Sequence, residues 1–183
     1  MSIDFKDHGK KPYVVNIEDA TLQNENYRTT IWTGEKLQLT VMTIQPNDDI
    51  GLEAHHGIDQ FIRIEEGDGL CMMGDSEDDL YFEQKVSDDD AIFVPADKWH
   101  NIINVGDKPL KLYTVYGGPD HLPGTVHPTH EDAENVHQNQ STSFANCSSC
   151  KQNNTLPHCG CTAAFKAAFV RPFNVFSYAN PTR

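Results

Sequence analysis

The chain has 183 residues, of which 38% are hydrophobic and 22% are charged, and its formal net charge is −13. This length favours one domain with a sizeable core, and the negative charge argues against nucleic acid as a partner, because phosphates would be repelled. No apolar run is long enough to cross a membrane, and the first residues lack the apolar stretch of a secretory signal. We therefore expect a cytoplasmic protein with no membrane partner.

Charge and cysteine content divide the chain into two parts. Residues 1–137 contain all 27 acidic residues and ten Lys and Arg, a formal charge of −17, whereas residues 138–183 contain four basic residues and no acidic ones. Four of the five cysteines also lie in the second part. We predict a main domain over residues 1–137, with an N-terminal arm, and a separate tail over residues 138–183.

The main domain has the pattern of short β-strands separated by turns. After an arm of about 30 residues with weak periodicity, alternating apolar and polar residues recur at intervals of about ten residues, divided by Gly, Pro, Asn and Asp. The predicted strands span residues 36–44, 50–55, 60–65, 69–73, 80–86, 91–94, 100–105 and 110–115. This spacing predicts an all-β barrel or sandwich.

The chain beyond residue 116 is less regular. A single helical turn is expected near His130, and residues 138–158 are rich in Asn, Gln and Ser, as linkers often are. Phe165 and Phe169 lie four apart among alanines, which predicts a short helix over residues 162–170. The tail is thus expected to be partly helical.

Four side chains of the main domain are candidate metal ligands. Alternate residues of a strand point to the same side, so Glu53 and His55 should share a face, with Gln60 on the next strand and His100 on the strand that follows Pro95. Imidazole and carboxylate together suit Zn, Mn, Fe or Ni. We predict that the four bind one divalent cation; the alternative is a barrel that binds a small molecule without metal.

The same residues resemble the motifs of the cupin superfamily. His55, Gln60 and Gly67 stand at the second His, the Glu and the closing Gly of the first cupin motif, and His100 and Asn104 stand at the His and Asn of the second. The resemblance covers roughly residues 35–116. It implies the double-stranded β-helix, or jelly-roll barrel, of cupins, with a metal site inside the barrel.

The chain departs from the cupin motifs at four positions. Glu53 replaces the first His and Gln60 replaces the Glu, so that the ligand set keeps one negative charge and is still expected to hold a divalent cation. Asn47 and Asp97 stand where the motifs have turn glycines. Asn and Asp tolerate left-handed backbone better than most residues, so we expect the turns to be kept.

The resemblance also implies a function. The main domain is similar to small single-domain bacterial cupins described as mannose-6-phosphate isomerase-like, which implies a metal-dependent sugar or sugar-phosphate isomerase with Glu53 as a candidate catalytic base. A non-haem metal dioxygenase and a non-enzymatic sugar- or effector-binding protein are the alternatives. No basic cluster accompanies the motifs, since Arg63 and Lys98 are not clearly inward, and this weakens the case for a phosphorylated substrate.

Several further features have more than one interpretation. The tail residues Cys147, Cys150, Cys159 and Cys161 are candidate ligands of a second, structural zinc ion, against the alternatives of reactive thiols or an incidental cluster.

Three histidines follow the last predicted strand, namely His121, His127 and His130. Solvated loop histidines are the favoured interpretation, against a segment that covers the barrel mouth. Phe61 and Arg63 point away from Gln60 on their strand, so this surface is a candidate homodimer interface.

Overall fold

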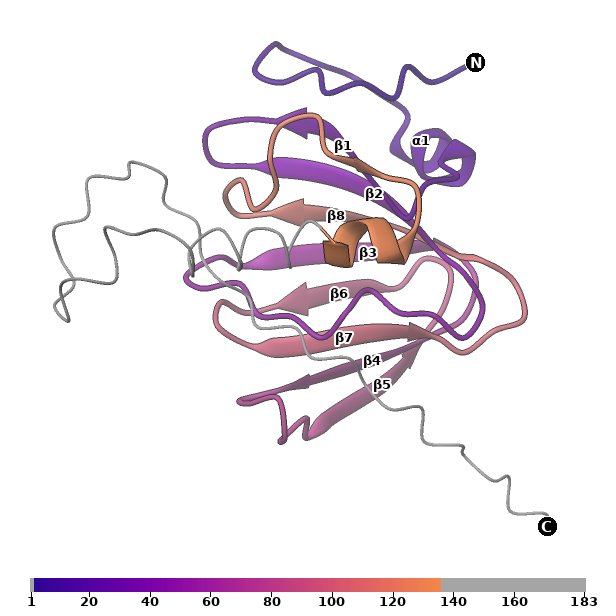
Figure 1. Ribbon diagram of the computed structural model, residues 1–183, viewed down its shortest axis with the longest axis vertical. Helices are drawn as coiled ribbons and strands as arrows, with labels where there is room; N and C mark the ends of the chain where they lie inside the picture. Colours follow the sequence, from indigo (N-terminus) through magenta and orange to yellow (C-terminus); the bar gives the residue numbers. More distant parts are fainter. Residues whose placement is uncertain (1, 136–183) are drawn as a thin grey trace, which may run out of the picture.

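Two antiparallel β-sheets form the body of the computed structural model, which describes residues 2–135 (Figure 1). The larger sheet has the strand order β6-β3-β8-β2-β1-β9, and the smaller has the order β5-β4-β7. The elements are α1 (Ile17–Gln23), β1 (Arg28–Thr33), β2 (Gln38–Ile44), β3 (Gln60–Glu66), β4 (Gly69–Gly74), β5 (Phe82–Val86), β6 (Ala91–Val94), β7 (Trp99–Asn104), β8 (Leu110–Tyr116) and β9 (Val126–His127).

The main core contains apolar residues from strands of both sheets. Ile62 and Ile64 on β3, Leu112 on β8 and Ile102 on β7 are each at most 1% exposed and belong to one cluster. Complete burial of such a side chain contributes about 1.5–3 kcal/mol. Because the alternating positions face this core, the predicted all-β fold is confirmed.

Within residues 2–135, the outer face of the large sheet is covered over one part only. The helix α1 is capped at its N-terminus by Asn16, whose side chain accepts a hydrogen bond from the Asp19 amide at 3.3 Å. Ala20 of this helix packs against Ile31 and Val41. This helix was not among the predicted elements, because seven residues are too few for a clear helical period.

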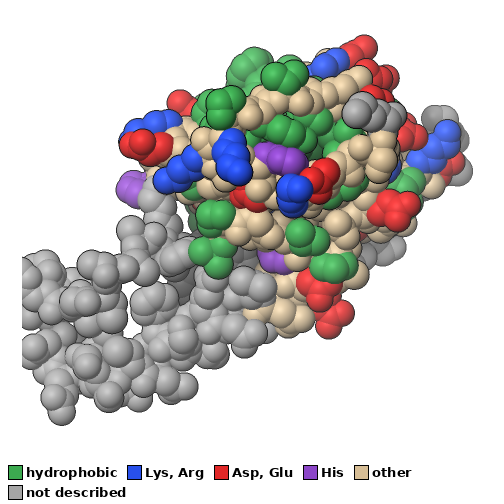
Figure 2. All heavy atoms as spheres, turned by 90° about the horizontal axis from the view of Figure 1, so that it is seen from above, with side chains coloured by type: hydrophobic (Ala, Val, Ile, Leu, Met, Phe, Trp, Pro, Cys, Tyr) green, Lys and Arg blue, Asp and Glu red, His purple; other side chains and the backbone are tan. Residues whose placement is uncertain are grey.

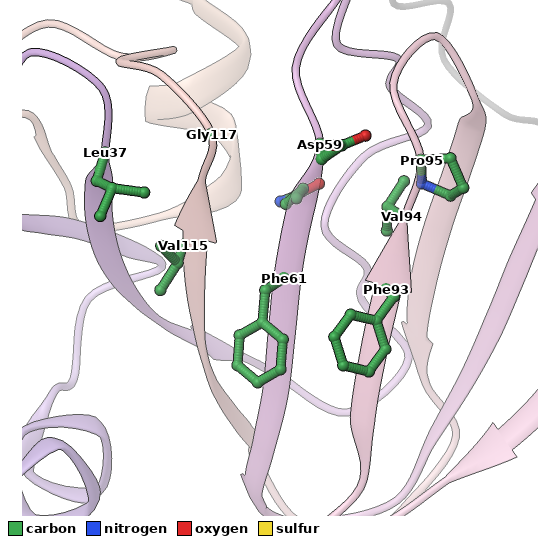
Figure 3. Close-up of a pocket in the computed structure, with 9 residues that line it drawn as sticks. Leu37, Asp59, Phe61, Phe93, Val94, Pro95, Val115 and Gly117 are labelled. Carbon is green, nitrogen blue, oxygen red and sulfur yellow. The ribbon is translucent and has the colours of Figure 1, made fainter.

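Over β3 and β6, side chains on the outer face reach the surface. Phe61 and Phe93 are cross-strand partners with ring centroids 5.3 Å apart, and Phe93 is 71% exposed. Figure 3 shows both rings side by side on β3 and β6, where they line an apolar pocket. The outward orientation predicted for Phe61 therefore holds.

One predicted strand, residues 50–55, is not regular. It contains one isolated bridge with β7, at Glu53, and a second lies just before it, at Asp49. Between the two bridges Gly51 has a φ of 87°. This left-handed residue interrupts the ladder. The other predicted strands correspond to β2–β8, with small shifts at their ends.

The two substituted turn positions adopt the expected backbone. Asn47 has a φ of 65° and Asp97 a φ of 67°, in the left-handed region that Asn and Asp tolerate. The amide of Asp97 also donates to the carbonyl of His55 at 3.0 Å. The turn before β7 thus holds the segment of the first motif in place.

The helical turn predicted near His130 is confirmed, since residues 130–135 are helical. No helix in the described part of the chain has both the length and the apolar character needed to cross a membrane. The predicted tail, with its candidate ligands Cys147, Cys150, Cys159 and Cys161 and its helix over residues 162–170, lies outside the described residues.

His130 fastens the segment after β9 to the turn after β2. Its Nδ1 lies 2.6 Å from Asp48 Oδ1, and its ring stacks on Tyr27 at 4.6 Å. This hydrogen bond raises the pKa of His130. The interaction of His130 with Asp48 therefore stabilises the folded protein fully at pH values below the unfolded-state pKa of about 6.5. This contribution is lost as the pH rises through the raised folded-state pKa of His130.

We accordingly expect His130→Gln to lower the free energy of unfolding more at about pH 6 than at about pH 9. Urea denaturation of the wild type and variant at both pH values measures the difference. Asp48→Asn should abolish the pH dependence of the effect of His130→Gln. Equal destabilisation by His130→Gln at the two pH values would contradict the assignment.

Candidate metal centre

Three of the four predicted ligands converge between the first and second motifs. Glu53 and His100 are paired through their backbones, with N–O distances of 3.0 and 2.9 Å, and His55 follows two residues after Glu53. One potential ligand atom from each of the three residues lies within 4.8 Å of the other two. A bridge between an irregular segment and β7 thus assembles the cluster.

The cluster is close and largely shielded from solvent. The Oε1 atom of Glu53 lies 3.3 Å from His55 Nε2 and 3.7 Å from His100 Nε2. The side chains of Glu53, His55 and His100 are 12%, 5% and 1% exposed. Such burial costs free energy unless the polar atoms find a partner.

Both imidazoles are oriented by a polar contact at Nδ1. The Nδ1 atom of His100 lies 3.0 Å from the carbonyl oxygen of Lys98, which can only accept, so Nδ1 carries the proton and Nε2 presents its lone pair. The Nδ1 atom of His55 lies 3.2 Å from Asp120 Oδ1. In each histidine, Nδ1 is held by an acceptor and Nε2 is directed toward Glu53. An imidazole that binds a metal through Nε2 is commonly oriented by such a contact at its other nitrogen.

The electrostatics of the cluster favour a positive charge at its centre. Burial alone would raise the pKa of Glu53, but the neighbouring His55 and Arg28 lower it below the ordinary value, so the carboxylate is ionised. Burial would lower the pKa of His55, yet Glu53 and Asp120 raise it to about 10. The pKa of His100 is lowered by burial.

Gln60 is buried on β3, where its position as a fourth ligand stays a prediction. Its side-chain amide nitrogen donates to Thr114 Oγ1 on β8 at 2.9 Å, so the amide oxygen does not contact Thr114. That oxygen is buried and has no hydrogen-bond partner among residues 2–135. An amide oxygen of this kind is available to a cation.

Two charged residues at this site were not predicted from the sequence. Arg28, on β1, is 2% exposed, and its Nη2 lies 4.0 Å from Glu53 Oε2. Asp120, in the segment after β8, contacts His55 as described above. Neither residue belongs to a cupin motif. For Arg28, the one signal in the sequence is a charged residue placed next to the β-branched run Thr29–Ile31.

The interpretation of the three late histidines as solvated is wrong. The side chain of His121 is 8% exposed, and its Nε2 lies 3.1 Å from the hydroxyl of Tyr116. Burial lowers the pKa of His121 to about 3, so it is neutral. His127 is buried on β9, and His130 is half-buried against Asp48. Contacts made by the segment after β8 bury them, and spacing along the chain cannot reveal these contacts.

The remaining candidates lie on the surface. His56, the neighbour of His55 in the chain, is 81% exposed at its side chain and pairs with Asp97, so it lies outside the cluster. Arg63 pairs with Asp89 and Lys98 with Asp75. Over the face seen in Figure 2, basic and acidic side chains lie beside one another and neither forms a continuous patch.

The residues present fit a divalent cation. The buried Nε2 of His100 has no hydrogen-bond partner among the described residues, although an ion would satisfy it. Glu53 supplies a negative charge, and a cation can take the place of the proton that His55 otherwise holds between two carboxylates. Two imidazoles and one carboxylate suit Zn, Mn, Fe or Ni.

Asp120 is expected to strengthen metal binding through His55. Asp120→Asn removes the negative charge that fixes the His55 tautomer, so the affinity for Zn²⁺ or Mn²⁺ should fall about 10–100-fold. Titration of metal-depleted protein by isothermal calorimetry measures this change, with Asp97→Asn as a control on an exposed turn. An unchanged affinity in Asp120→Asn would show that Asp120 does not orient a ligand.

Comparisons with known proteins agree with this architecture. Residues 40–116 match the cupin domain family. The uncharacterised protein YrkC of Bacillus subtilis is 55% identical over 129 residues, which cover 70% of this chain and 69% of YrkC. The uncharacterised protein L612 of Acanthamoeba polyphaga mimivirus is 40% identical over 115 residues, covering 62% of this chain and 70% of L612.

A solved structure supports the same assignment. The crystal structure of BH2720 from Bacillus halodurans shares 52% sequence identity and a TM-score of 0.70, and the similarity covers 71% of this chain and 98% of that one. The chain belongs to the cupin superfamily, and its body is a cupin jelly roll. Cupins include metal-dependent enzymes, and the cluster of Glu53, His55 and His100 is compatible with one metal ion.

Proposed function

We propose that the protein is a metal-dependent cupin enzyme that binds one divalent cation through Glu53, His55 and His100, with Gln60 as a fourth ligand, and acts on a small molecule. The observation that carries this proposal is the buried Nε2 of His100, which lacks a partner in the described chain and lies 3.7 Å from an ionised carboxylate. Without a cation, this arrangement leaves a polar atom unsatisfied at a cost in stability.

The proposed reaction is the isomerisation of a sugar-like hydroxy-carbonyl compound. A bound divalent ion would supply Lewis-acid stabilisation of negative charge on neighbouring oxygens. Glu53 is the proposed base, and it would leave the metal to act. It removes a proton from the hydroxyl-bearing carbon and returns it to the adjacent carbonyl carbon, while the hydroxyl proton passes to the carbonyl oxygen, so no oxidant is consumed. Its lowered pKa keeps it ionised, and because a low pKa also makes it a weak base, the reaction would depend on the metal to acidify the carbon-bound proton.

A second candidate function is that of a non-haem iron oxygenase. Two histidines and one carboxylate, the composition of the cluster, are also the ligand set of such enzymes. A cupin that only binds a sugar or another effector is the third candidate. The three differ in the metal that the protein holds and in whether oxygen is consumed.

Metal analysis and a solvent-exchange assay separate these functions. The protein is purified without chelator, its metal content is measured, and it is incubated with aldoses and aldose phosphates in deuterated water. We expect about one Zn or Mn per chain and deuterium at the carbon beside the carbonyl. Iron with oxygen consumption would favour the oxygenase, and absence of metal would favour the binding protein.

We further propose that the protein is a cytoplasmic homodimer that associates through the apolar surface of Phe61 and Phe93. The exposure of Phe93 supports this interface. Light scattering of the wild type and of Phe93→Asp measures the mass, and the substitution should yield monomers. A monomeric wild type would refute the dimer.

A further inference from the structure

Arg28 is the buried charge that the proposed reaction does not use. It is 2% exposed on β1, and in the described part of the chain its single ion pair is with Glu53 Oε2, at 4.0 Å. Its Nε atom is buried and has no hydrogen-bond partner among those residues. A buried guanidinium with an unused donor is costly, because its desolvation is not fully repaid.

Other buried or partly buried cations of the molecule are satisfied differently. The ammonium group of Lys111 donates to the carbonyls of Leu22 and Asn24 at 2.6 and 2.7 Å, where it stabilises the end of α1. Arg63 contacts Glu65 at 3.2 Å and also pairs with Asp89 near the surface. Arg28 lies over the Tyr27 ring at 5.5 Å, but within residues 2–135 it has no hydrogen bond or close ion pair comparable to these, which points to a partner that enters the site.

The charge of the site indicates the sign of that partner. The charged side chains that act on Arg28 are Glu53 and Asp120, and the neighbouring Tyr27 and Tyr116 stay neutral because burial raises their pKa. With a divalent cation in place and both histidines neutral, the ion and Arg28 together exceed the two carboxylates by one positive charge. A monoanion neutralises this excess.

We propose that Arg28 binds a carboxylate of the substrate, so that the substrate is a sugar acid, a hydroxy-carbonyl compound that also carries a carboxylate, rather than a neutral sugar. This proposal rests on the metal site described under Proposed function. Because Arg28 Nη2 lies 4.0 Å from Glu53, a ligand bound beside Glu53 is within reach of the guanidinium.

A carboxylate matches the site better than a phosphate does. The planar guanidinium presents parallel donors to two carboxylate oxygens, and one arginine balances one negative charge. A phosphate monoester carries up to two charges and three acceptor oxygens. The other basic side chains near the motifs, Arg63 and Lys98, pair with carboxylates on the surface.

The test measures binding rather than turnover. Full-length protein loaded with Mn²⁺ is titrated by calorimetry with glycolate, with ethylene glycol as its uncharged counterpart, and with inorganic phosphate. Glycolate should bind most tightly. In Arg28→Gln its affinity should fall at least about tenfold, as expected for a lost charge-assisted hydrogen bond, while Arg28→Lys should retain part of it.

Arg63→Gln is the matched control, because it removes an arginine from the outer surface and should leave glycolate affinity unchanged. Metal stoichiometry is measured in every variant. Equal glycolate affinity in wild type and Arg28→Gln, with metal retained, would refute carboxylate binding by Arg28 and leave the proposed metal-dependent function standing. Absence of metal from the wild type would refute the proposed function, and the charge argument would fall with it.

The wild type alone also decides the substrate class if Arg28→Gln does not fold. Tighter binding of glycolate than of ethylene glycol and phosphate supports the carboxylate. Tighter binding of phosphate, or no discrimination between glycolate and ethylene glycol, overturns it.

Discussion

His100→Ala is expected to lose stoichiometric metal. His100 contributes a nearly inaccessible Nε2 whose lone pair is directed toward Glu53 by the hydrogen bond from Nδ1 to the carbonyl of Lys98. Alanine removes this ligand, and the small cavity that remains cannot replace it. Elemental analysis of protein grown with supplementary Zn²⁺ or Mn²⁺ gives the metal content per chain.

His56→Ala is the control for this experiment. His56 is next to His55 in the chain, but its side chain is 81% exposed and pairs with Asp97, so its removal should leave the metal content unchanged. Circular dichroism shows whether both variants fold. A folded His100→Ala protein that retains one metal per chain would refute the site.

Asn104→Ala is expected to destabilise the fold without a direct effect on the ligands. The side-chain amide of Asn104 donates to the carbonyls of Ile44 and Lys108 at 2.9 and 2.8 Å and accepts from the amide of Gly106 at 2.9 Å. It thus joins the end of β2 and the turn after β7. Loss of these three bonds should lower the free energy of unfolding by about 2–4 kcal/mol, measured by urea denaturation.

Asn101→Ala, on the same strand, is the matched control. Asn101 is 8% exposed, and its Oδ1 has no hydrogen-bond partner among the described residues. Its truncation should therefore cost clearly less than that of Asn104. Similar losses of stability in the two variants would show that the bonds of Asn104 do not hold the barrel together.

The strands were predictable because their signals are local. Alternation over residues 60–65 places Ile62 and Ile64 on one side, and the structure buries both. Asn47 and Asp97 were expected to keep left-handed turns, and their φ values agree. Residues 50–55 were predicted as a strand because alternation does not register the left-handed backbone of Gly51.

The sequence by itself determined the cupin fold and the candidate ligands Glu53, His55 and His100, because motif spacing and strand alternation are properties of neighbouring residues. Only the tertiary structure placed Arg28 and Asp120 beside them. Arg28 lies on β1 and Asp120 lies in the segment after β8, and their proximity depends on which strands pair. Strand alternation predicts the side of the sheet to which a side chain points, but it does not predict which residue from a distant part of the chain contacts it there.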